Sequence, residues 1–136
     1  MVMLVDYLDA IARRKKRDVL YVDFGLALGS CPDRSAWKML PARTQLIEWF
    51  CEQEIELEIA VFVANDEILI TPPYRGEFYI DIPYDKDDPK CQLVLQHMET
   101  NDGFSKLHGV RLCLLELSVA EKYAYRDLPG FLESLL

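Results

Sequence analysis

An alternating stretch between residues 54 and 82 is the feature that most narrows the structure of this 136-residue chain. Glutamates occupy every second position at its start (Glu54, Glu56 and Glu58), and apolar residues stand between and after them. Successive side chains of a β-strand point to opposite faces, so this period of two predicts a strand over 54–63. The alternation returns over 77–82 and predicts another strand there.

A tight turn is expected to join the first of these strands to a further one. Asn65 and Asp66 both tolerate the positive φ angles that a short hairpin turn requires. Pairing Ala64 with Glu67 then brings the apolar residues of the two strands onto one face, so the register is self-consistent. We therefore predict a three-stranded antiparallel meander over about 55–82, with one apolar face and one largely acidic face.

The other segments follow the spacing of helices and strands. Helices are expected over 3–16, over 41–53, from Pro89 with Asp88 as its N-cap, and briefly from Asp127. Strands are expected over 18–24 and 110–119. The order α-β-α-β-β-β-α-β-α predicts an α+β fold, with the meander packed against helices. The chain length and a hydrophobic content of 51% fit a single domain over residues 1–136.

The segment 110–119 is almost continuously apolar, which is typical of a strand buried on both faces. Such a strand needs cover on each side of the sheet. The sequence therefore also predicts that a helix covers part of the acidic face of the meander.

The charges are distributed unevenly along the chain. The net charge is −8, but residues 13–17 are five consecutive cations, so the rest of the chain is more acidic than this sum suggests. Phosphate binding needs a broad basic surface, and we therefore expect no nucleic-acid partner. The basic segment either complements the dipole at the end of the first helix or contacts an acidic segment, for example in a second copy.

The sequence predicts a soluble, cytoplasmic protein with no membrane partner. No apolar run reaches the length of a membrane span, and the N-terminal charges follow the apolar residues instead of preceding them as in a secretory signal. The cysteines are far apart in the sequence and have no metal-binding spacing, so we expect no metal and no cofactor. Cys51, Cys91 and Cys113 fall on apolar faces, which predicts buried, reduced thiols.

No catalytic motif is present, and we expect that the protein is not an enzyme. The sequence has no nucleophile elbow, no phosphate-binding glycine loop and no zinc-protease motif. The alternative is an enzyme whose site is assembled from dispersed residues, with Asp23, Cys31 and His97 as the candidates. That alternative requires these side chains to converge in one pocket.

The acidic face of the meander is the candidate binding site. Its charges would attract and orient a basic protein, and neighbouring apolar and aromatic side chains would anchor it. The predicted partner-binding residues are Glu54, Glu56, Glu58, Glu67, Glu77, Tyr79, Asp81, Phe62 and Leu69. Tyr74 and Tyr84 lie in the flanking loops. The alternative is a solvated sheet face whose charges only discourage edge pairing.

In size, charge and architecture the chain is similar to immunity proteins, which neutralise basic nuclease toxins by covering their active sites. This likeness implies an inhibitory module with a basic partner, a toxin or an effector. The order of helix, meander, helix, strand and helix also resembles type III secretion chaperones, which implies a homodimer that binds an effector segment. The extra N-terminal helix and strand, and the single strand after the third helix, depart from that pattern. A further alternative is an assembly subunit whose exposed strand builds a symmetric oligomer.

Overall fold

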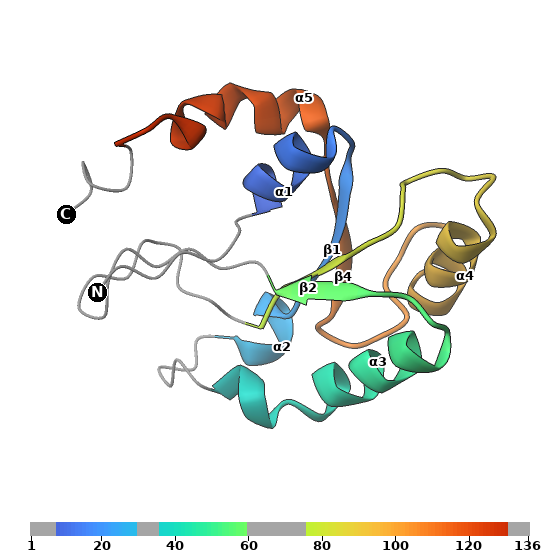
Figure 1. Cartoon of the computed structure of the whole chain (residues 1–136). Helices are drawn as coiled ribbons and strands as arrows, with labels where there is room; N and C mark the ends of the chain where they lie inside the picture. Colours follow the sequence, from blue (N-terminus) through green and yellow to red (C-terminus); the bar gives the residue numbers. More distant parts are fainter. Residues whose placement is uncertain (1–7, 30–35, 60–75, 131–136) are drawn as a thin grey trace.

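A computed structural model describes residues 8–29, 36–59 and 76–130 (Figure 1). The helical elements are α1 (Leu8–Lys15), α2 (Gly25–Leu28), η1 (Ala36–Met39), α3 (Pro41–Glu52), α4 (Pro89–Met98), α5 (Leu117–Ala120) and η2 (Glu121–Asp127). The strands are β1 (Val19–Asp23), β2 (Leu57–Ile59), β3 (Phe78–Ile80) and β4 (Arg111–Leu115). The predicted α+β fold class is confirmed.

The strands form one antiparallel sheet with the order β2-β3-β1-β4. β2 and β3 belong to the first and last segments of the predicted meander, and they pair directly with each other, with Glu58 opposite Tyr79. The middle segment therefore does not separate them at these positions. The predicted turn at Asn65 and Asp66, and the strand after it, lie outside the described residues.

The larger core lies between one face of the sheet and the helices α3 and α4. Leu20, Val22 and Phe24 project from β1 and its end into this core, as the alternation of that strand predicts. Phe50 of α3 makes an edge-to-face contact with Phe78 of β3, with ring centroids 5.9 Å apart. In Figure 1, α3 lies on the opposite side of the strands from α1 and α5.

A smaller core covers the other face of the sheet. Ile11 and Ala12 of α1 pack with Val19, Tyr79 and Ala120, and all five residues are buried. The sheet is therefore enclosed between two helical layers, and α1 lies over the face that the sequence analysis assigns to acidic residues.

The local signals for the starts of α3 and α4 are confirmed. The carboxylate of Asp88 accepts hydrogen bonds from the backbone N–H groups of Lys90 and Cys91, so it caps α4. Proline occupies the first turn of both α3 and α4, where its missing N–H leaves no helical bond unmade. The predicted apolar stripe of α4 is also confirmed, since Cys91, Val94 and Met98 are buried.

Two expectations are wrong here: the extent and burial of the strand over 110–119, and the burial of Cys51. β4 ends at Leu115, and its residues are half-buried or exposed, because it forms an edge of the sheet and has one neighbouring strand in the described structure. The residues that follow are helical from Leu117 to Asp127, where a strand was expected up to residue 119. The short helix expected after Asp127 falls mostly on residues 131–136, which lie outside the described residues. Cys51 is exposed, because α3 packs against the sheet on one side only and Cys51 lies off that side.

The loop before β4 passes very close to α2. Gly109 has a φ of +74°, and its carbonyl accepts a hydrogen bond from the backbone N–H of Ala27 at 3.0 Å. A Cβ atom built on Gly109 would lie 2.7 Å from the backbone nitrogen of Ala27. Glycine is required here both by the left-handed conformation and by the lack of space.

Candidate functional site

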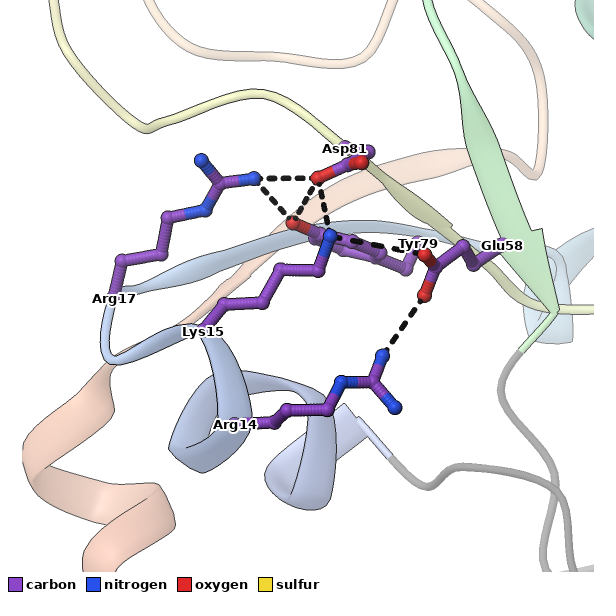
Figure 2. A network of polar contacts seen from close by, with 6 residues as sticks. All are labelled: Arg14, Lys15, Arg17, Glu58, Tyr79 and Asp81. Atoms are coloured by element: carbon purple, nitrogen blue, oxygen red, sulfur yellow. Dashed lines mark hydrogen bonds and ion pairs between the residues drawn. The ribbon is translucent and has the colours of Figure 1, made fainter.

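The basic segment at the end of α1 contacts the acidic face of the sheet within the same molecule (Figure 2). Arg14, Lys15 and Arg17 extend toward β2 and β3 and reach Glu58 and Asp81. We call these five residues, with Tyr79, the charge network. The sequence analysis left open whether the basic segment needs an acidic partner, and the described structure supplies that partner in cis.

Asp81 is the centre of the charge network. One of its carboxylate oxygens accepts hydrogen bonds from Lys15 Nζ at 2.8 Å, from Arg17 at 2.6 Å and from the Tyr79 hydroxyl at 2.9 Å. The guanidinium of Arg17 also donates to the Tyr79 hydroxyl at 2.6 Å. The tyrosine hydroxyl therefore connects the buried ring of Tyr79 to the charges above it.

Glu58 forms the more exposed part of the charge network. Its carboxylate lies 3.2 Å from the guanidinium of Arg14 and 3.7 Å from Lys15 Nζ. These side chains keep much of their solvent exposure, so the pairs contribute little to stability. The two cations do offset the negative charge of Glu58, so Glu58 attracts a basic partner protein less strongly.

The surroundings shift the pKa values of this group in consistent directions. Burial would raise the pKa of Asp81, but hydrogen bonds from Lys15 and Tyr79 and the nearby positive charges outweigh it, so the pKa is lowered. The hydrogen bond to Asp81 raises the pKa of Lys15, despite the opposing effect of burial. Burial raises the pKa of the Tyr79 hydroxyl. At neutral pH, Asp81 and Lys15 therefore face each other in their charged forms.

A second group of charged residues attaches α1 to the C-terminal helical segment. Arg13 donates to Asp9 at 2.7 Å, to Asp127 at 2.7 and 2.8 Å, and to the carbonyl of Ala120 at 2.9 Å. Arg126 also pairs with Asp9 at 3.2 Å. Only 8% of the Arg13 side chain is exposed, so this cation is held almost entirely by protein groups.

The predicted docking surface is therefore only partly available to a partner. Tyr79 has no exposed surface, which corrects its expected role as a surface anchor: α1 covers the face on which it lies. Glu58 is paired with Arg14 of α1. Asp81 is paired with Lys15 of α1 and with Arg17, which follows this helix. Glu77 is half-buried. The remaining predicted residues, Glu67, Phe62 and Leu69, lie outside the described residues.

Glu54 and Glu56 do remain exposed, beside a second acidic segment. Lys90 Nζ donates to the carbonyl of Glu54 at 3.1 Å, and the backbone N–H of Asp81 donates to the carbonyl of Glu56 at 2.9 Å. These bonds place the turn before β2 next to the loop between β3 and α4. The exposed acids of the two segments form what we call the acidic rim: Glu52, Glu54, Glu56, Asp85 and Asp87. Tyr84, 37% exposed, lies in the same loop.

The candidate residues of the enzyme alternative have separate surroundings. Asp23 is paired with Arg111 at 2.7 Å, and it also accepts a hydrogen bond from the backbone N–H of Gly25. His97 stacks on Trp49, with ring centroids 3.8 Å apart and nearly parallel planes. Cys31 lies outside the described residues. The described structure therefore assigns Asp23 to an ion pair and His97 to a ring stack between α3 and α4.

The buried position of His97 in this stack predicts that the free energy of unfolding depends on pH. Burial, with a smaller contribution from Lys106, lowers the pKa of His97 below its ordinary value of 6.5. The unfolded chain then takes up the proton more readily, so the free energy of unfolding should fall as the pH drops below 6.5. Chemical denaturation on both sides of this pH measures the change. In His97→Gln this part of the pH dependence should be absent, and an unchanged slope in the variant would contradict the assignment.

Cysteines and acids form no recognisable metal site in the described ranges. Cys51, Cys91 and Cys113 are free thiols, and no group of three His, Cys, Asp or Glu side chains in these ranges could hold a metal ion. Burial raises the pKa of both Cys91 and Cys113, which favours the uncharged thiol at each position.

Comparisons with known proteins place the chain in no family. No family model, no curated protein and no solved structure matches it. None of the helices that the structure describes is long and apolar enough to cross a membrane.

Sequence reasoning predicted a helix over part of the acidic face, but it did not identify that helix as α1 or predict that the basic segment binds this face in the same molecule; two signals pointed to this. One signal is that the chain contains both a compact basic segment and an acidic strand face. Only a short connection separates the basic segment from β1, which keeps it close to the sheet. The other is the almost continuous apolar run over 110–119, which predicted cover on the acidic side of the sheet. The hydroxyl of Tyr79 as a bridge between Arg17 and Asp81 had no signal in the sequence.

Proposed function

We propose that the protein is a small binding module that occludes a basic partner protein, in the manner of an immunity protein acting on a nuclease toxin. The acidic rim is the proposed docking surface. The observation that carries this proposal is the exposure of Glu54 and Glu56 next to Asp85 and Asp87, in a molecule in which Glu58 and Asp81 are already paired with its own cations.

Charge and an exposed aromatic side chain support the rim as an interaction surface. Exposed carboxylates raise the rate of encounter with a basic protein and orient it before contact. Tyr84 offers an aromatic side chain of the kind that anchors interfaces, and it lies between the two parts of the rim along the chain. The mechanism is steric and electrostatic: the module covers the partner's basic active surface and needs no chemistry of its own. We further propose that it acts in the cytoplasm.

The test compares charge reversal inside and outside the rim. Basic proteins captured by the wild-type chain from extracts of its native host are identified, purified and titrated against each variant at low and high salt. Glu54→Lys with Glu56→Lys should weaken binding at least about tenfold, because two attractive contacts become repulsive. If the partner is a nuclease, the same variant should lose inhibition of DNA cleavage.

A matched control makes the same change of net charge elsewhere. Glu116 and Glu121 are exposed and lie at the C-terminal end of the fold, so Glu116→Lys with Glu121→Lys should alter binding by less than about twofold. Equal effects of the two double variants would show that only net charge matters and would overturn the rim as a site.

A further inference from the structure

Among the residues that the structure describes, β4 is an edge strand without the usual protection. Within the described residues it pairs with β1 alone, so the backbone groups on its other side have no strand partner there. Its sequence is Arg-Leu-Cys-Leu-Leu, and its one charged side chain, Arg111, is already paired with Asp23 at 2.7 Å. Proteins usually guard such edges with charges, proline or very short strands, because an open apolar edge invites pairing with another chain.

The opposite edge of the sheet is guarded in the expected way. Among the described residues β2 covers Leu57–Ile59; it carries Glu58 and follows the exposed Glu56. Two copies pairing antiparallel about Glu58 would bring Glu58 and its cationic partners Arg14 and Lys15 opposite the same groups of the second copy. Pairing between copies is therefore disfavoured at β2. β4 contains no acidic side chain that would oppose such pairing.

We propose that β4 pairs with β4 of a second copy, antiparallel, so that two sheets join into one across a two-fold axis. Such an axis is perpendicular to the sheet, so residues that oppose each other must point to the same face. The register centred on Cys113 uses the whole five-residue strand. It places Leu112 opposite Leu114 of the second copy, and Arg111 opposite Leu115 of the second copy.

In this register the side chains of β4 face compatible side chains of the second copy. Leu114 is 37% exposed in the single chain and would be covered by Leu112 of the second copy. Arg111 lies opposite Leu115 of the second copy and keeps its own partner Asp23, so this register places no like charges opposite each other. The acidic rims lie beside β2, at the far edges of the joined sheet, where their like charges are kept apart.

The first test is the oligomeric state of the full chain. Sedimentation velocity over increasing protein concentration should show a dimer for the wild type. Leu114→Lys should raise the dimer dissociation constant at least about tenfold, because a charge enters the centre of the joined sheet. Leu93→Lys is the matched control: this leucine is equally exposed, at 37%, but lies on α4, so the variant should dimerise like the wild type. A monomeric wild type, or an undiminished dimer in Leu114→Lys, overturns the proposal.

A second test does not depend on the folding of a charged variant. Mild oxidation of the wild type with copper phenanthroline and oxygen should link Cys113 of one copy to Cys113 of the other: two thiols lose two protons and two electrons to the oxidant. Mass spectrometry of the linked peptides identifies the residues, which distinguishes this link from one through the exposed Cys51. Absence of the link between the two Cys113 side chains in a dimeric wild type counts against the register. Charge reversal in the acidic rim, by Glu54→Lys with Glu56→Lys, should leave the dimer intact. The dimer proposal and the proposed function can therefore be disproved separately.

Discussion

Replacing Arg13 by methionine is expected to lower the free energy of unfolding by about 3 kcal/mol. The guanidinium is almost fully buried and donates to Asp9, Asp127 and the carbonyl of Ala120. Methionine retains much of the apolar stem but leaves Asp9, a buried carboxylate, with Arg126 as its remaining cationic partner. Chemical denaturation followed by circular dichroism measures the loss.

The adjacent arginine is the matched control. Arg14 is 49% exposed and contacts Glu58 at the surface, so Arg14→Met should change the free energy of unfolding by less than about 0.5 kcal/mol. Similar losses in the two variants would contradict the distinction drawn between the buried and the exposed pair. A neutral Arg13→Met would show that the contact between α1 and η2 does not stabilise the fold.

Replacing Gly109 by alanine is expected to destabilise the protein by a similar amount, about 3 kcal/mol. The new Cβ would meet the backbone of Ala27 at 2.7 Å, and backbone cannot move aside as a side-chain end can. The positive φ of Gly109 adds strain for any residue with a Cβ. Thermal unfolding of the variant measures the combined cost.

Gly103 separates the two causes. Its φ is +84°, but a Cβ built there meets nothing within 4 Å, so Gly103→Ala should cost only the backbone strain, about 1 kcal/mol. If the two alanine variants lose the same stability, the close approach of Gly109 to α2 is not energetically important. A larger loss at Gly109 supports the packing of that loop against α2 as described.

The parts of the fold that were predictable from sequence are those determined by neighbouring residues. The cap at Asp88 and the proline after it fix the start of α4 through bonds made within one turn. The alternating faces of β1 follow from its pleat alone. The acidic residues of the charge network were also found, because alternation places Glu58 and Asp81 on one face of the sheet.

What could not be predicted depends on contacts between distant residues. Lys15 meets Asp81 across a separation of 66 residues, and only the three-dimensional path of α1 brings them together. The apolar run after residue 110 is compatible with a strand or a buried helix, so the change of structure between Leu115 and Leu117 was hidden. Glu54 fits the alternation but has a φ of +58°, which puts it in the turn before β2.

The bond between Arg13 and Asp127 also has a consequence for how the protein is made. These residues are 114 positions apart, so the layer over this face of the sheet needs both an early and a late part of the chain. During translation α1 is made long before η2, so Arg13 cannot contact Asp127 until the late part of the chain has been synthesised. The other helical layer contains α3 and α4, which are synthesised earlier. The packing of α1 against the C-terminal helical segment therefore cannot precede the synthesis of residue 127, whereas the layer that contains α3 and α4 needs only segments made earlier.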